Sequence, residues 1–248
     1  MTVNHDATKA EQIQIILLKK NKKMISHKYK CIFIHIPKCA GTSIETALGH
    51  LDNYTGRGSQ DHRSLRMIQP ITLEAFLSID NIKEVLRKIK HNYYKKVLNP
   101  KNKYIVTRKQ YNSYFKFTFI RNPWARAFSW YQNVMRDEVH KRYFGIKGKL
   151  PLTEFLKLYA GKGILMPQLY WIKDFKGNIS LDYIGRFEKL NDDFEAICRH
   201  LNISNIALPH KIKGGGKDYR KYYDNESIEI IRTAYQEEIK LFNYTFEE

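Results

Sequence analysis

Apolar and polar positions alternate along the chain in blocks that predict strands followed by helices. Residues 31–36, "CIFIHI", form the kind of apolar run that is typical of a strand buried on both faces of a parallel sheet. Residues 115–120, "FKFTFI", and residues 181–188, "LDYIGRFE", predict two further strands. Because a helical pattern follows each strand, we expect a three-layer α/β fold with a central parallel sheet.

Start and stop signals place the helices. Residues 42–49 predict a helix that Gly49 stops, and residues 123–135 predict one with Pro123 in its first turn. Residues 81–114, which are basic and rich in tyrosine, predict a helix followed by a loop. The other expected helices are residues 152–160, residues 191–201 with Asn191 as the N-cap, and residues 227–241.

The length of 248 residues fits a single domain, 1–248, in which residues 1–30 form a basic N-terminal extension. The chain has 43 Lys and Arg against 25 Asp and Glu, a formal charge of +18, so its surface should attract anions. Nucleic acid, an acidic polysaccharide, an anionic membrane and a phosphorylated nucleotide all fit that charge, which does not choose among them.

Cysteine usage and apolar runs indicate the compartment. The three cysteines show no C-x-x-C pairing, which excludes a disulfide scaffold and a structural zinc site and favours a reduced setting. The run "IQIILL", residues 13–18, is too short for a membrane span or a signal peptide. We therefore expect a cytoplasmic protein of prokaryotic type, without a signal peptide or transmembrane anchor.

The first predicted strand-to-helix turn has the composition of a phosphate cradle. In open parallel sheets, ligands bind beyond the carboxyl ends of the strands, where N–H groups at helix N-termini point outward. Gly41 lets the backbone approach an anion, and Thr42 and Ser43 offer hydroxyls beside the positive end of the helix dipole. Lys38, before the turn, would meet the reacting end of a bound nucleotide.

This turn differs from the Walker P-loop. In that motif the lysine follows the second glycine directly, whereas Lys38 precedes Gly41 by three residues. A magnesium-binding acid after a later strand is also missing from its expected place. Both differences disfavour a kinase-like phosphotransferase, which remains an alternative.

The second turn, in "FIRNPWARAFSWY", predicts another phosphate clamp. Arg121 leaves the end of its strand, and Ser129 follows eight residues later, about 12 Å along a helix. An arginine and a serine so placed can grip one phosphate from two directions. Two clamps imply a nucleotide with phosphates at both ends.

The pair "HIPKCAGTS" and "FIRNPWARAFSWY" resembles the signature of sulfotransferases that use 3'-phosphoadenosine 5'-phosphosulfate (PAPS), in the carbohydrate branch related to heparan sulfate 2-O- and chondroitin sulfotransferases. "YIGRFEKLNDDFEAICRHL" and the C-terminal sequence are similar to that branch too. The resemblance implies a P-loop-like nucleotide-binding fold, PAPS as co-substrate, 3',5'-adenosine bisphosphate as product and no metal. It also implies a glycan, glycolipid or other hydroxyl acceptor, including an acidic one, and no nucleic-acid partner.

The resemblance implies site residues by position. Lys38 would contact the sulfuryl oxygens, and Arg121 and Ser129 would bind the 3'-phosphate. Many relatives have Thr-Gly where this chain has Cys39-Ala40, a change that removes no charge and that we expect to preserve activity. The 5'-phosphate loop comprises Pro37, Lys38, Cys39, Ala40, Gly41, Thr42 and Ser43, and Lys217 or Arg220 in "KIKGGGKDYRKYY" would add positive charge over the nucleotide.

The acceptor hydroxyl needs a base, and His62 in "GSQDHRSLRMI" is favoured because a histidine pKa of about 6.5 suits proton removal near neutral pH. An exposed loop histidine is the alternative interpretation, with Asp61 or Glu188 as the fallback base. His35 is expected to be a hydrogen-bonded strand residue.

Some positions keep two interpretations. Gln168, Tyr170 and Trp171 fit either an acceptor cleft or a helix packing face, and Arg186 and Phe187 either approach the adenine or end a strand. Three function classes stay open: a PAPS-dependent sulfotransferase, which is favoured, a kinase-like phosphotransferase, and a non-catalytic binder of polyanions, whose affinity would fall steeply with salt.

Overall fold

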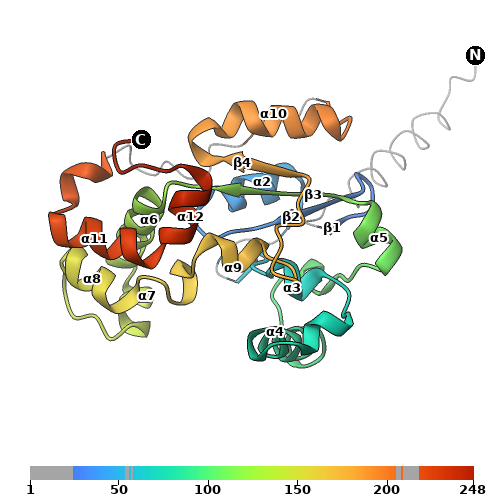
Figure 1. Cartoon of the computed structure of the whole chain (residues 1–248), viewed down its shortest axis with the longest axis horizontal. Coiled ribbons are helices and arrows are strands. Elements are labelled where there is room, and N and C mark those ends of the chain that lie inside the picture. Colours follow the sequence, from blue (N-terminus) through green and yellow to red (C-terminus); the bar gives the residue numbers. More distant parts are fainter. Residues whose placement is uncertain (1–24, 54–55, 57, 205–207, 209–217) are drawn as a thin grey trace, which may run out of the picture.

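A four-stranded sheet lies at the centre of the protein (Figure 1). The computed structural model describes residues 25–53, 56, 58–204, 208 and 218–248. The strands are β1 (Ile25–Ser26), β2 (Cys31–Ile34), β3 (Phe115–Ile120) and β4 (Tyr183–Arg186), and they lie in that order across the sheet. β2, β3 and β4 are parallel, as predicted, whereas the short β1 pairs antiparallel with β2.

Helices flank the sheet. In Figure 1, α10 lies on one side of the strands and α3 and α9 on the other, while α6, α8, α11 and α12 gather toward the carboxyl ends of the strands. The α-helices are α2 (Gly41–Ala47), α3 (Leu65–Ile68), α4 (Ile79–Ile89), α5 (Arg108–Ser113), α6 (Pro123–Arg136), α7 (Glu138–Tyr143), α8 (Leu152–Tyr159), α9 (Gln168–Ile172), α10 (Leu190–His200), α11 (Asn225–Ala234) and α12 (Gln236–Phe242). The shorter turns of helix are η1 (Leu73–Phe76), η2 (Lys90–Tyr94), η3 (Pro100–Lys103), η4 (Gly163–Leu165), η5 (Phe187–Lys189) and η6 (Tyr219–Tyr222).

The core forms around β2 and β3. Every residue of β2 is buried, and Phe33 stacks on Phe117 of β3 at 5.1 Å between ring centroids. This two-sided burial confirms what the apolar runs predict, because a parallel strand covered on both faces has no room for exposed polar positions. The strand ends are fixed as a result, and with them the turns that begin at His35 and Arg121.

Three predictions about helices were wrong. Asn191 is not an N-cap, because α10 continues from η5 and begins at Leu190 without a side-chain cap. The expected closing helix is two helices that meet at Tyr235, and the first of them is capped by Asp224. Residues 81–114 hold more helix than expected, ending in α5 with a Thr107 capping box. Among the described residues, none of the helices has the length and apolarity to span a membrane.

Candidate functional site

The turn between β2 and α2 presents an open helix N-terminus. Lys38 and Ala40 take left-handed backbone conformations, with φ of 71° and 63°, and Ala40 is the N-cap without a capping side chain. Ser43 N–H bonds back to the Ala40 carbonyl, but no acceptor among the described residues takes the N–H groups of Gly41 and Thr42. These two donors lie at the positive end of the helix, where an anion could accept from them.

Gly41 is needed for a reason the sequence did not disclose. A Cβ at this position would lie 1.9 Å from Cδ2 of His35, so the imidazole fills the space that a side chain would need. The predicted reason was close approach to an anion. The structure adds a packing reason, because any larger residue would displace His35 from under the loop.

The two turns predicted to bind phosphate meet in space. Nη1 of Arg121, at the end of β3, donates to the Lys38 carbonyl at 3.1 Å. Nε of the buried Arg126, on α6, donates to the Pro37 carbonyl at 3.0 Å. The second turn therefore holds the first in place. The two turns are in direct contact although about eighty residues separate them in the sequence.

Gln168 fastens the same region from α9. Its side-chain oxygen accepts from the Arg121 N–H at 2.8 Å, and its amide donates to the buried Glu238 at 3.0 Å. The thiol of Cys39 also lies 3.4 Å from Gln168 Oε1, and burial raises the pKa of that thiol to about 12. Gln168 is therefore buried and supports the turn between β2 and α2 through these hydrogen bonds. Cys39 is a protonated thiol that packs within the same turn.

Basic side chains gather beside the turn. Lys38 Nζ lies 3.5 Å from Oδ1 of Asn133 and 6.0 Å from the ring of Trp130, both on α6. Burial, together with the positive charges of Arg121 and Arg136, lowers the pKa of Lys38 to about 8. In the described part of the chain, no carboxylate forms an ion pair with these three cations. An anion bound here would relieve their mutual repulsion.

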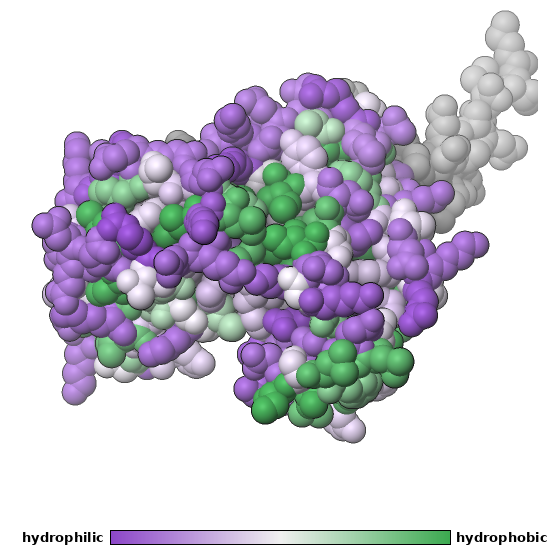
Figure 2. Space-filling view, in the orientation of Figure 1, coloured by the Kyte–Doolittle hydropathy of each residue, from purple (hydrophilic) through white to green (hydrophobic). Residues whose placement is uncertain are grey.

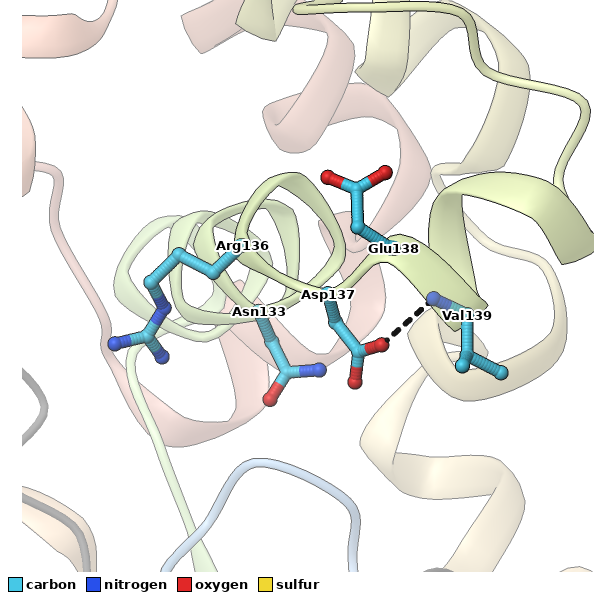
Figure 3. Close-up of a pocket in the computed structure, with 5 residues that line it drawn as sticks. All are labelled: Asn133, Arg136, Asp137, Glu138 and Val139. Carbon is cyan, nitrogen blue, oxygen red and sulfur yellow. Dashed lines mark hydrogen bonds between the residues drawn. The ribbon is translucent and has the colours of Figure 1, made fainter.

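A pocket of 450 Å³ opens at the end of α6. Asn133, Arg136 and Asp137 point to one side of the helix end, whereas Glu138 points away (Figure 3). Oδ1 of Asp137 accepts from the Val139 N–H at 3.0 Å and so caps α7. Because Asn133 also contacts Lys38, this pocket adjoins the predicted sulfuryl position.

His62 lies against His35. The two rings are 4.2 Å apart between centroids, and Nδ1 of His35 is 2.9 Å from the buried Glu45. Nδ1 of His62 is buried without a hydrogen-bond partner among the described residues. Burial and the neighbouring His35 lower the pKa of His62 to about 3, well below the ordinary value that we used to favour it as a base. The ring is therefore neutral at pH 7.

The fallback bases have structural roles. Asp61 is buried in a two-pronged ion pair with Arg63, at 2.6 Å from Nη2, and Arg63 holds the pKa of Asp61 below its usual range. Oε1 of Glu188 accepts from the Asn122 N–H at 2.8 Å at the start of α6. His35 is the hydrogen-bonded residue that we expected, directly after β2.

The remaining predicted site residues differ in whether their side chains already have partners. Ser129 is half-buried on α6 and makes no hydrogen bond with the described residues, so its hydroxyl is available. Arg220 is paired with Asp218 at 2.7 Å and with the Glu247 carbonyl, so the structure does not turn it toward Lys38. Lys217 lies outside the described residues. Arg186 ends β4, and Phe187 stacks on Arg121 with its ring centroid 3.9 Å from Cζ.

Sequence reasoning missed several supporting residues. Arg126 stands inside the quoted motif, yet nothing in a single sequence shows that its guanidinium faces inward to bond three carbonyls. Asn122 caps α6 by accepting from the N–H groups of Trp124 and Ala125, which the Asn-Pro pair could have indicated. Among the described residues, no cluster of His, Cys, Asp or Glu could hold a metal ion.

Comparisons with known proteins agree with these motifs. Residues 21–163, more than half of the chain, match the sequence model of the Sulfotransferase family, a range that contains both turns. Carbohydrate sulfotransferase 10 of Xenopus laevis is 24% identical over 263 residues, which cover 89% of this chain and 66% of that protein. The chain thus spans slightly less than two thirds of this relative's length. No solved structure matches the chain.

Proposed function

Because the chain belongs to the sulfotransferase family, we propose that it transfers a sulfuryl group from PAPS to a hydroxyl of a glycan or glycoconjugate. The observation that carries this proposal is the group of basic side chains, Lys38, Arg121 and Arg136, which lies beside an uncapped helix N-terminus and has no ion-paired carboxylate among the described residues. Such a group suits a ligand with several negative charges at fixed places.

The turn would hold the 5'-phosphate and stabilise the charge that develops there. The sulfur–oxygen bond to the 5'-phosphate breaks as the acceptor oxygen bonds to sulfur, so negative charge grows on the phosphate oxygen. In this proposal the N–H groups of Gly41 and Thr42 and the ammonium of Lys38 would face that charge; the lack of an acceptor for the two N–H groups among the described residues supports this. Preorganised donors of this kind act without reorganisation during the reaction.

We assign the 3'-phosphate to Arg121 and Ser129. Arg121 is anchored by the Lys38 carbonyl and by stacking on Phe187, which fixes its guanidinium. The hydroxyl of Ser129 has no other partner among the described residues. Ser129 is half-buried on α6, one helical turn from Asn133, which contacts Lys38.

We assign the acceptor's proton to His62. Its ring is neutral, as a base must be, and its buried Nδ1 lacks a partner among the described residues. The low pKa of His62 disfavours proton uptake, and the negative charge of PAPS would raise that pKa. The His35–Glu45 pair would keep the His62 ring in position.

The acceptor class rests on the relative. Carbohydrate sulfotransferase 10 of Xenopus laevis is named for a carbohydrate acceptor, and the alignment covers most of this chain. The pocket beside Asn133 adjoins Lys38 and offers polar side chains to a sugar hydroxyl. A glycan acceptor at this position is the simplest assignment.

Calorimetric titration with 3',5'-adenosine bisphosphate tests the site. We expect tight binding by the wild type and a loss of at least about tenfold for Ser129→Ala, because one charge-assisted hydrogen bond contributes about 1.5–3 kcal/mol. Arg121→Ala should lose more, but it also frees the Lys38 carbonyl, so Ser129→Ala is the cleaner variant.

Arg142→Ala is the matched control, because Arg142 is an exposed arginine of α7 outside the turns. It should bind like the wild type. Unaltered affinity in both Ser129→Ala and Arg121→Ala would refute the placement of the 3'-phosphate.

A further inference from the structure

The helix α4 carries its apolar side chains on the outside. Ile79, Ile82, Leu86 and Ile89 follow one another at intervals of three, four and three residues, so they form one stripe along the helix. All four are exposed, Ile79 by 73% and Leu86 by 60%. In a water-soluble domain, such a stripe normally faces the core.

Polar contacts fix α4 in this orientation. Glu84 accepts from the Ser64 hydroxyl at 2.7 Å and from the Tyr170 hydroxyl at 2.6 Å, and all of these atoms face the protein. Asn81 is buried as well and donates to the Phe175 carbonyl at 2.8 Å. Turning the helix to bury its isoleucines would break these bonds and leave Ser64 and Tyr170 unpaired.

The exposed apolar surface extends beyond α4. We call residues 71–98 the α4 lobe. It comprises η1, α4 and η2. Leu73 and Leu77 beside η1 are exposed by 85% and 79%, and Tyr93 and Tyr94 of η2 are exposed as well. Figure 2 shows the apolar side chains gathered over the lobe that Figure 1 labels α4. A surface of this kind marks an interaction site.

Basic side chains border this surface. The α4 lobe contains six Lys and Arg and three Asp and Glu, and one of the acids, Glu84, is buried. Lys83 and Lys90 lie next to the apolar stripe by helical spacing, and Lys95 and Lys96 follow the two exposed tyrosines. Apolar residues edged by lysines and tyrosines are the composition of surfaces that lie in the headgroup region of a membrane.

We propose that the α4 lobe docks the protein on an anionic lipid bilayer, with Leu73, Leu77 and the α4 stripe inserted between the headgroups. The lysines would pair with acidic lipids, each adding affinity near the surface. A second copy of the chain fits less well, because it would bring the same lysine border and a net charge of the same sign. This inference does not depend on the proposed sulfuryl transfer.

Vesicle co-sedimentation tests the proposal. The probes are vesicles of phosphatidylcholine alone and vesicles with 30 mol% phosphatidylglycerol, and the full chain is used throughout. We expect the wild type to bind the acidic vesicles, and the double variant Ile79→Gln/Leu86→Gln to bind at least about tenfold more weakly. Lys95→Gln and Lys96→Gln should each weaken binding about fivefold on acidic vesicles.

The control is Leu241→Gln on α12, which removes a comparably exposed leucine outside the lobe and should leave binding unchanged. Thermal unfolding of each variant verifies the fold. Absence of wild-type binding, or equal binding by Ile79→Gln/Leu86→Gln, would overturn the proposal. Sedimentation equilibrium showing a dimer that the double variant abolishes would also overturn it in favour of self-association.

Discussion

At the carboxyl ends of β2 and β3, basic side chains gather without an ion-paired carboxylate in the described part of the chain, whereas on the α4 lobe apolar side chains are exposed to water. The first region concentrates positive charge, and the second exposes apolar surface to water. The turn that carries Lys38 is held by bonds from Arg126 to the Pro37 carbonyl and from Arg121 to the Lys38 carbonyl, and the positive charges of Arg121 and Arg136 act on Lys38. The lobe is held by polar bonds through Glu84, and its apolar side chains are exposed to water.

The difference shows that one fold can present two kinds of surface, a fixed group of charges and an exposed apolar face. At the turns, polar groups are preorganised by a packed core, so a small charged ligand meets a fixed geometry. On the lobe, the polar residues Asn81 and Glu84 face the protein, so the apolar residues of α4 face the solvent. They form an extended surface, which a flat partner can contact without entering a pocket.

The sharpest effect is expected at His62. If its buried, unpartnered Nδ1 belongs to the reaction, His62→Asn should lower the transfer rate about 10²- to 10⁴-fold while 3',5'-adenosine bisphosphate binds as before. The measurement is transfer from labelled PAPS beside calorimetry. His200→Asn, on an exposed position of α10, is the control that should change neither. Full activity in His62→Asn would move the base elsewhere.

Gly41→Ala tests whether the turn is as rigid as its packing implies. The added Cβ would lie 1.9 Å from His35 Cδ2, so the free energy of unfolding should fall by about 1–3 kcal/mol. Denaturant titration measures this change. Ala40→Gly is the opposite case, because it relieves a left-handed alanine and should keep or raise stability. A neutral Gly41→Ala would show that His35 moves freely.

The pH dependence of nucleotide binding tests the basic group. Lys38 has a pKa of about 8, so its charge is present below that pH and is lost as the pH rises through it. The affinity for 3',5'-adenosine bisphosphate should therefore weaken by up to about tenfold from pH 7 to pH 9, and calorimetry at both values measures it. Lys38→Arg should remove this dependence. An equal decline in Lys38→Arg would assign it to another group.

The smallest effect concerns the lobe. Leu86→Gln replaces a leucine that already faces water, so the free energy of unfolding should stay within about 0.5 kcal/mol of the wild type. Leu65→Gln, in the fully buried start of α3, should cost several times more. Thermal or denaturant unfolding compares them. Strong destabilisation by Leu86→Gln would mean that Leu86 is covered in solution.

Much of the structure around the two strand-to-helix turns could be predicted from the sequence. The two strands appear as apolar runs, and Lys38 and Arg121 stand in motifs whose residue types match their chemistry. The packing reason for Gly41 and the inward guanidinium of Arg126 could not be predicted, because both depend on partners distant in the chain. The pKa of His62 depends likewise on His35 and on burial.

For the α4 lobe, the sequence predicts the helix but not its orientation. The sequence of residues 81–114 predicts a helix followed by a loop, but it does not say which face of the helix turns inward. That choice depends on Ser64 and Tyr170, which bond Glu84 from α9 and from the residue before α3. Asn191 failed as a cap for a related reason, since the preceding turn of helix continues into α10.

Sulfuryl transfer by Lys38→Ala tests the central claim most directly. Wild type, Lys38→Ala and the exposed control Lys162→Ala are compared with labelled PAPS over a panel of glycan acceptors. Loss of a preorganised charge at the leaving group should lower the rate about 10²- to 10³-fold, while some binding of 3',5'-adenosine bisphosphate survives. Lys162→Ala should match the wild type. Transfer by Lys38→Ala within twofold of the wild type, on an acceptor that the wild type sulfates, would contradict the account.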